Sequence, residues 1–137
     1  MGRVYEILAG THRIEQEGAD KITSGERTKG WKPLMSRVNG NVPRETIAAM
    51  TVPPRNISLV NVYLRTKISV ASEGDVTLNT NGPDKAALWV DGKPVEGTTL
   101  FKTNLKAGEH TVLVRLDAKA LPKAFRLVSK DVTFATE

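Results

Sequence analysis

The clearest pattern along the chain is a strict alternation of apolar and polar residues in the segment SLVNVYLRTKISV, residues 58–70. Apolar residues occupy every second position from Val60 to Val70, and Thr66 is the only polar residue in that row. A period of two over such a length is typical of a long strand with one buried face. The same phase places Tyr63 and Arg65 on the opposite face of this strand.

Shorter strand-like runs, separated by turn signals, accompany this long strand. Asp91-Gly92 is a favoured type I′ hairpin pair, because both central residues of that turn need positive φ. Pro94 follows soon after and lacks an N–H, so the return strand is expected at a sheet edge. Turn signals about every eight to twelve residues predict an all-β fold, an antiparallel β-sandwich of jelly-roll type. A second long strand is predicted at GEHTVLVRLD (108–117), and the predicted short strands are VYEIL (4–8), VTLNT (76–80), AALWV (86–90), FRLVS (125–129) and VTFAT (132–136).

The N-terminal third is less regular than the rest. EQEGADKITSGERTKG (15–30) is polar and rich in glycine, which favours a loop, and VPRETIAAM (42–50) suggests a short helix with Pro43 near its first position. A chain of 137 residues suits a single domain. We therefore expect one domain over 1–137, with an irregular part (1–57) and a regular strand core (58–137). The strand-like start without a signal-peptide pattern suggests a domain excised from a larger protein.

Trp89 is out of phase with Leu88 and Val90 and should point away from the core that these two residues enter. The sequence leaves two alternatives for Trp89. Either loops of the first fifty residues cover its ring, which gives a small second core, or the ring stacks on a sugar. Trp31, which precedes Lys32-Pro33, either fixes a loop or lines a cleft.

Composition excludes several classes of function. The absence of cysteine excludes disulfides, thiolate zinc sites and a cysteine nucleophile. The net charge of +5 is spread along the chain, which favours a solvated surface, with affinity for anionic polymers as the alternative. Aromatic residues make up only 5% of the chain, too few for a nucleic-acid surface that interleaves them with basic residues. No apolar run approaches the ~20 residues of a membrane span.

Catalytic and metal-binding patterns are sparse. The two histidines, His12 and His110, have no acid or nucleophile motif beside them, and no G-x-S-x-G elbow occurs. We therefore expect a structural role for His110 and no enzymatic activity. Asn79, Asn81 and Asp84 offer oxygen ligands that could hold calcium, although they lack the spacing of an EF-hand loop. No other cofactor is predicted.

The segment VTLNTNGPDKAALWVDGKPVEGTTLFKTNLKAGEHTVLVRLD (76–117) resembles the hairpin core of PA14-like and galactose-binding-like β-sandwich modules. The resemblance is strongest from Leu59 to Asp117. It implies an accessory module of a large multidomain bacterial protein that is secreted or located in the periplasm or cell envelope. Sugar-binding PA14 modules commonly hold calcium with adjacent aspartates, whereas Asp84 and Asp91 are isolated here.

These observations lead to two functional hypotheses. The first is a non-catalytic accessory module that binds a polysaccharide or other glycan and is flanked by neighbouring domains of its parent protein. The second is a structural or protein-docking domain without a small-molecule ligand. Under the first hypothesis, the expected ligand-binding residues are Trp89, Trp31, Tyr63, Arg65, Asp91 and Lys93.

Overall fold

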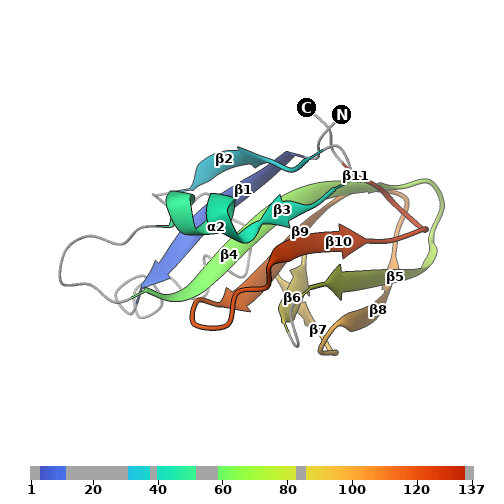
Figure 1. Ribbon diagram of the computed structural model, residues 1–137. Coiled ribbons are helices and arrows are strands. Elements are labelled where there is room, and N and C mark those ends of the chain that lie inside the picture. Colours follow the sequence, from blue (N-terminus) through green and yellow to red (C-terminus); the bar gives the residue numbers. More distant parts are fainter. Residues whose placement is uncertain (1–3, 12–30, 38–39, 52–58, 83–85, 135–137) are drawn as a thin grey trace.

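The fold is an antiparallel β-sandwich of two sheets with one short helix (Figure 1). The computed structural model describes residues 4–11, 31–37, 40–51, 59–82 and 86–134. The larger sheet has the strand order β2-β1-β4-β9-β6-β7, with β11 also paired to β4, and the smaller has the order β3-β10-β5-β8. The expected all-β sandwich is therefore confirmed. The elements are β1 (Val4–Thr11), β2 (Lys32–Met35), β3 (Val42–Pro43), α2 (Arg44–Met50), β4 (Leu59–Val70), β5 (Gly74–Asn81), β6 (Ala87–Val90), β7 (Lys93–Val95), β8 (Leu100–Leu105), β9 (Gly108–Asp117), β10 (Ala124–Val128) and β11 (Thr133–Phe134).

The main core lies between the two sheets and is made by the apolar rows that the alternation predicts. Val62, Leu64 and Ile68 of β4 face Phe101 of β8 and Phe125 of β10 in one cluster, and all five are at most 1% exposed. Thr66, the polar residue within the β4 row, is also buried, and its Oγ1 donates a hydrogen bond to the carbonyl oxygen of Val4 at 2.7 Å. The hydroxyl is thus accommodated without an unsatisfied donor.

The prediction of a single buried face on the long strand is wrong at its centre. Tyr63 and Arg65 are only 4% and 6% exposed, although they lie on the face opposite the main core. Alternation in sequence predicts which residues share a face, but it does not show what covers the outer face. This outer face of the larger sheet becomes the candidate site.

The first 57 residues contain more regular structure than their sequence suggests. β1 is an internal strand of the larger sheet, paired with both β2 and β4. The predicted short helix is α2, with Pro43 at its N-cap and Ile47 fully buried in the core. β2 and β3 were not predicted, because a four-residue strand containing Pro33 and a two-residue strand are too short to show a period. Residues 15–30 lie outside the described part.

The β6–β7 hairpin confirms the predicted turn. Asp91 and Gly92 have φ values of 51° and 82°, the positive pair that a type I′ turn needs. Pro94 lies in β7, which is the edge strand of the larger sheet beyond β6. An edge position tolerates a residue without an N–H, as the sequence led us to expect.

One edge of β4 is shared by two short strands from opposite ends of the chain. β1 pairs with residues 59–65 of β4, while Phe134 of β11 pairs with Ile68. The hydrogen bond from Thr66 to Val4 lies between these two pairings. The beginning of β1 and the end of β11 therefore meet end to end along the same side of β4.

Candidate functional site

The candidate site is the outer face of the larger sheet, where paired residues from four strands point to the same side. Directly opposite residues in antiparallel strands share a face, so the register defines two rows across the sheet. We call their aromatic, apolar and charged members, together with Trp31, the outer-face patch. The first row is Glu6–Arg65–Leu113–Trp89, and the second is Leu8–Tyr63–Arg115–Ala87.

The floor of the outer-face patch is a small apolar cluster separate from the main core. Leu8, Tyr63 and Leu113 are at most 4% exposed, and the half-buried indoles of Trp31 and Trp89 pack against them. The phase argument for Trp89 is thus confirmed, since its ring lies on the face opposite Leu88 and Val90. From the sequence, Trp31 was expected to fix a loop or to line a cleft; the fold brings it into the same cluster as Trp89.

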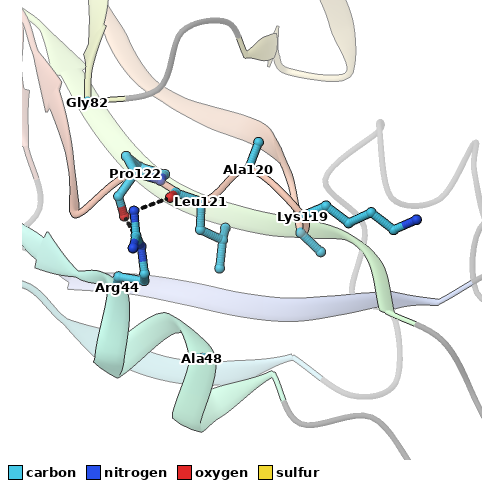
Figure 2. Close-up of a pocket in the computed structure, with 8 residues that line it drawn as sticks. Arg44, Ala48, Gly82, Lys119, Ala120, Leu121 and Pro122 are labelled. Atoms are coloured by element: carbon cyan, nitrogen blue, oxygen red, sulfur yellow. Dashed lines mark hydrogen bonds between the residues drawn. The ribbon is translucent and has the colours of Figure 1, made fainter.

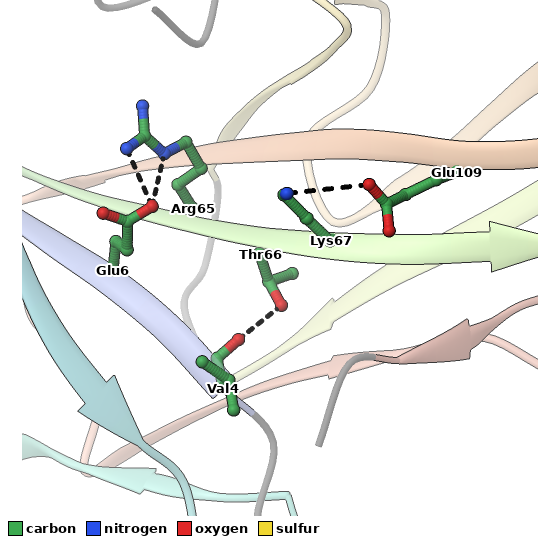
Figure 3. A network of polar contacts seen from close by, with 6 residues as sticks. All are labelled: Val4, Glu6, Arg65, Thr66, Lys67 and Glu109. Atoms are coloured by element: carbon green, nitrogen blue, oxygen red, sulfur yellow. Dashed lines mark hydrogen bonds and ion pairs between the residues drawn. The ribbon is translucent and has the colours of Figure 1, made fainter. Parts of the chain in front are cut away.

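Arg65 is the best-anchored charged residue of the outer-face patch. Its Nε and Nη2 donate to Oε1 of Glu6 at 3.2 and 2.8 Å, and its guanidinium carbon lies 4.1 Å from the ring centroid of Trp31. Figure 3 shows Arg65 and Thr66 leaving β4 on opposite sides, Arg65 toward Glu6 and Thr66 toward Val4. A charge-assisted contact and a cation–π contact together hold the Trp31 indole.

Arg115 and Trp89 form a second guanidinium–indole pair. The guanidinium carbon of Arg115 lies 5.4 Å from the Trp89 ring centroid, and the Arg115 side chain is exposed. Alternation along β9 predicts only that Arg115 points away from the main core. Its proximity to Trp89 depends on the pairing of β6 with β9, which alternation within one strand does not reveal.

Asp91 does not join the outer-face patch, because both its carboxylate oxygens contact the beginning of β9. Oδ1 accepts the backbone N–H of Thr111 at 2.9 Å, and Oδ2 lies 2.6 Å from Nδ1 of His110. Nε2 of His110 lies 2.7 Å from the carbonyl oxygen of Lys106. The hydrogen bond to Asp91, aided by the Lys106 carbonyl, raises the pKa of His110 above its ordinary value.

The fold thus brings an acid to His110 that no sequence motif indicated. The side chain of His110 is 13% exposed, in keeping with the structural role that we expected. His12 lies outside the described residues. Lys93 is exposed and pairs with Val90, which faces the core. The register therefore places Lys93 on the face of the sheet opposite to Trp89, outside the outer-face patch.

Two of the three proposed calcium ligands occupy a strand in place of the expected loop. Asn79 and Asn81 are exposed residues of β5, paired with β10, and Asp84 lies outside the described residues. Within the described ranges, no group of three or more His, Cys, Asp or Glu residues could hold a metal ion. Calcium binding stays a prediction.

A pocket of about 510 Å³ lies between α2 and the segment after β9 (Figure 2). Arg44 fixes one wall by donating from Nε to the carbonyl oxygen of Pro122 at 3.1 Å and from Nη2 to that of Leu121 at 2.7 Å. Lys119 also lines the pocket, but its side chain extends away from Arg44. No sequence motif indicated this pocket. The guanidinium of Arg44 already donates hydrogen bonds to main-chain carbonyl oxygens.

Comparisons with known proteins identify similar folds at low sequence identity. No family model and no curated protein matches the chain. A β-glucosidase from Kluyveromyces marxianus is similar over 98% of this chain and 16% of its own, with a TM-score of 0.52 and 15% identity. A family 35 carbohydrate binding module from an environmental isolate is similar over 57% of this chain and 73% of its own, with a TM-score of 0.42 and 16% identity. An α-xylosidase from Xanthomonas citri gives a TM-score of 0.38 at 13% identity, over 96% of this chain and 16% of its own.

The described residues contain no helix long and apolar enough to cross a membrane. The similarity to the β-glucosidase concerns the fold alone, and this chain spans only a small part of that protein's length. It agrees with the two-sheet sandwich seen here. The chain is thus similar in fold to a β-sandwich portion of a much longer glycoside-processing enzyme.

Proposed function

We propose that this chain is a non-catalytic accessory module that binds carbohydrate at the outer-face patch. The observation that carries the proposal is the pair of indoles, Trp31 and Trp89, each set against a guanidinium on one sheet face. Both rings are half-buried, so part of each stays accessible. The expected parent is an exported multidomain bacterial protein, in which neighbouring domains would be further partners.

The chemistry of the patch suits a sugar ring. An indole offers a flat apolar surface to the C–H face of a pyranose, and guanidinium N–H groups donate to its hydroxyls. Trp89 and Arg65 stand two strands apart in the same row, a separation of about 10 Å at the usual strand spacing. The likeness to part of a β-glucosidase agrees with a role beside enzymes that act on glycosides.

Titration of the purified chain with a panel of polysaccharides, followed by tryptophan fluorescence and calorimetry, tests the proposal. Trp89→Ala and Trp31→Ala should each weaken binding by about tenfold or more, because stacked aromatic contacts contribute strongly to recognition. Leu100→Ala is the matched control, since Leu100 is a 50% exposed apolar residue on the other sheet. The proposal fails if no polysaccharide binds at millimolar sugar, or if the control loses as much affinity as the tryptophan variants.

A structural or docking module is the second candidate function. It is favoured by the burial of Leu8, Tyr63 and Leu113, which is the burial expected of a second core. In that case the two indoles seal this core and contact no ligand. Acrylamide quenching separates the candidates, because sealed indoles resist quenching, whereas a ligand platform is quenched when free and protected when polysaccharide is added.

A further inference from the structure

The charged side chains on the outer face of the larger sheet have partners, with one exception. Arg65 is paired with Glu6 at 2.8 Å, and Lys67 with Glu109 at 3.6 Å. Asp117, which the register places on the same face, accepts the backbone N–H of Lys119 through Oδ1 at 2.9 Å.

Arg115 is the exception. Among the described residues it forms no ion pair and no side-chain hydrogen bond, and its one specific contact is the ring of Trp89. Its N–H donors are therefore available to a ligand.

The surroundings of Arg115 suit a bound anion. It stands on the internal strand β9, directly between Tyr63 of β4 and Ala87 of β6. Ala87 has a small side chain, so the guanidinium has no bulky neighbour directly opposite on that side. A planar guanidinium presents paired donors that match a carboxylate or sulfate in bidentate geometry, and the adjacent indole can hold the ring that carries the anion.

We propose that Arg115, held against Trp89, selects acidic polysaccharides by pairing with a carboxylate or sulfate group on the sugar that stacks on Trp89. This inference rests on the proposed carbohydrate binding and adds the class of carbohydrate. The net charge of +5 would favour the approach of such polymers at low salt. The paired charges Arg65–Glu6 and Lys67–Glu109 contribute little net field, which leaves Arg115 as the discriminating cation of this face.

Matched polymers test the proposal on the wild-type chain, so no variant has to fold. Polygalacturonate is compared with its fully methyl-esterified form, and dextran sulfate with dextran. Each pair keeps the backbone and changes the charge. A bidentate charged contact should give the anionic member an advantage of about 10- to 100-fold. A preference within the first pair identifies a carboxylate ligand, and a preference within the second a sulfate. Equal affinity within both pairs overturns the proposal.

Variants locate the preference. Arg115→Met should abolish the advantage of the anionic polymer while leaving the Trp89-dependent binding of its neutral form, and Arg115→Lys should retain only part of it. Lys67→Met, which removes an exposed cation from the same face, should leave the preference unchanged. If Arg115→Met weakens acidic and neutral polymers equally, charge selection is refuted but carbohydrate binding stands. If duplex DNA competes as well as the acidic polymer, unspecific electrostatics explains the preference, and the proposal is also refuted. If no polymer binds, both proposals fail.

Discussion

Replacing Arg65 with methionine should destabilise the fold substantially, because this buried guanidinium joins two elements of the outer-face patch. Arg65 is 6% exposed, donates twice to Glu6 and stacks on Trp31 at 4.1 Å. Methionine keeps most of the apolar stem, so the variant isolates the polar and cation–π contributions from packing.

The magnitude follows from these contacts. A hydrogen bond to a charged group contributes about 1.5–3 kcal/mol, and a desolvated cation–π contact about 1–2 kcal/mol. Two effects reduce the sum. Methionine relieves the desolvation of the guanidinium, and the side chain of Glu6 is 39% exposed, so water can solvate the carboxylate that remains. We expect a net loss of about 2–3 kcal/mol, which lowers Tm by about 6–10 °C in a domain of this size.

The matched control stands two residues away on the same strand face. Figure 3 shows the ion pair between Lys67 and Glu109. Its two charged atoms are 3.6 Å apart, and the side chains are 63% and 65% exposed. Exposed pairs contribute about 0–1 kcal/mol, so Lys67→Met should change Tm by no more than about 3 °C.

Chemical and thermal denaturation of both variants, followed by circular dichroism, gives the comparison. Tryptophan emission reports separately on the environment of Trp31, which should become more exposed in Arg65→Met. Equal losses of stability in the two variants would refute the argument that burial and the indole contact decide the contribution of Arg65.

Three further predictions concern other parts of the fold. Asp91 raises the pKa of His110 above its ordinary 6.5, so the stability that this pair confers should be complete below pH 6.5. This stability should be lost as the pH rises through the pKa of His110 in the folded state. His110→Gln should remove the pH dependence of the free energy of unfolding, measured by urea titration across that window. Gly82→Ala should lower the free energy of unfolding by more than about 2 kcal/mol, because φ is +118° and a Cβ would lie 2.2 Å from a backbone carbonyl oxygen. Gly74→Ala is the control in the same denaturation assay. No atom lies within 4 Å of a Cβ at this position, so the loss should be no more than about 1 kcal/mol. Phe101→Ala should cost about 3–5 kcal/mol by thermal melting, because this ring is fully buried between the sheets, and a loss below about 1 kcal/mol would contradict the assigned core.

The regular part of the fold could be predicted because its signals are local. Strand alternation and the Asp91-Gly92 turn depend on a few neighbouring residues, and they gave the positions of β4, β6 and β9 and the outward orientation of Trp89. Neither β2 nor β3 could be found in this way, because they are too short to show a period. Their existence depends on partner strands distant in the chain.

The composition of the candidate site could be predicted only in part. Trp31, Tyr63, Arg65 and Trp89 were singled out one by one, but their assembly requires the pairing of β1, β4, β9 and β6. The contact between Arg65 and Glu6 spans 59 residues, and that between His110 and Asp91 spans 19. Such contacts arise from strand order, which a single sequence does not reveal.

The meeting of β1 and β11 along one edge of β4 determines how this sandwich would connect to flanking chain. Chain preceding Val4 and chain following Phe134 would attach at neighbouring points along the same side of β4. In a longer polypeptide the sandwich would then project from the chain, because its two attachment points are close together. It would add little to the distance between the segments before and after it. Tension along such a polypeptide would act first on the pairings of β1 and β11 with β4, and through Tyr5 and Ile7 of β1 it would reach the main core directly. The Trp89 end of the sheet would stay free to reach a partner at a distance from the main chain.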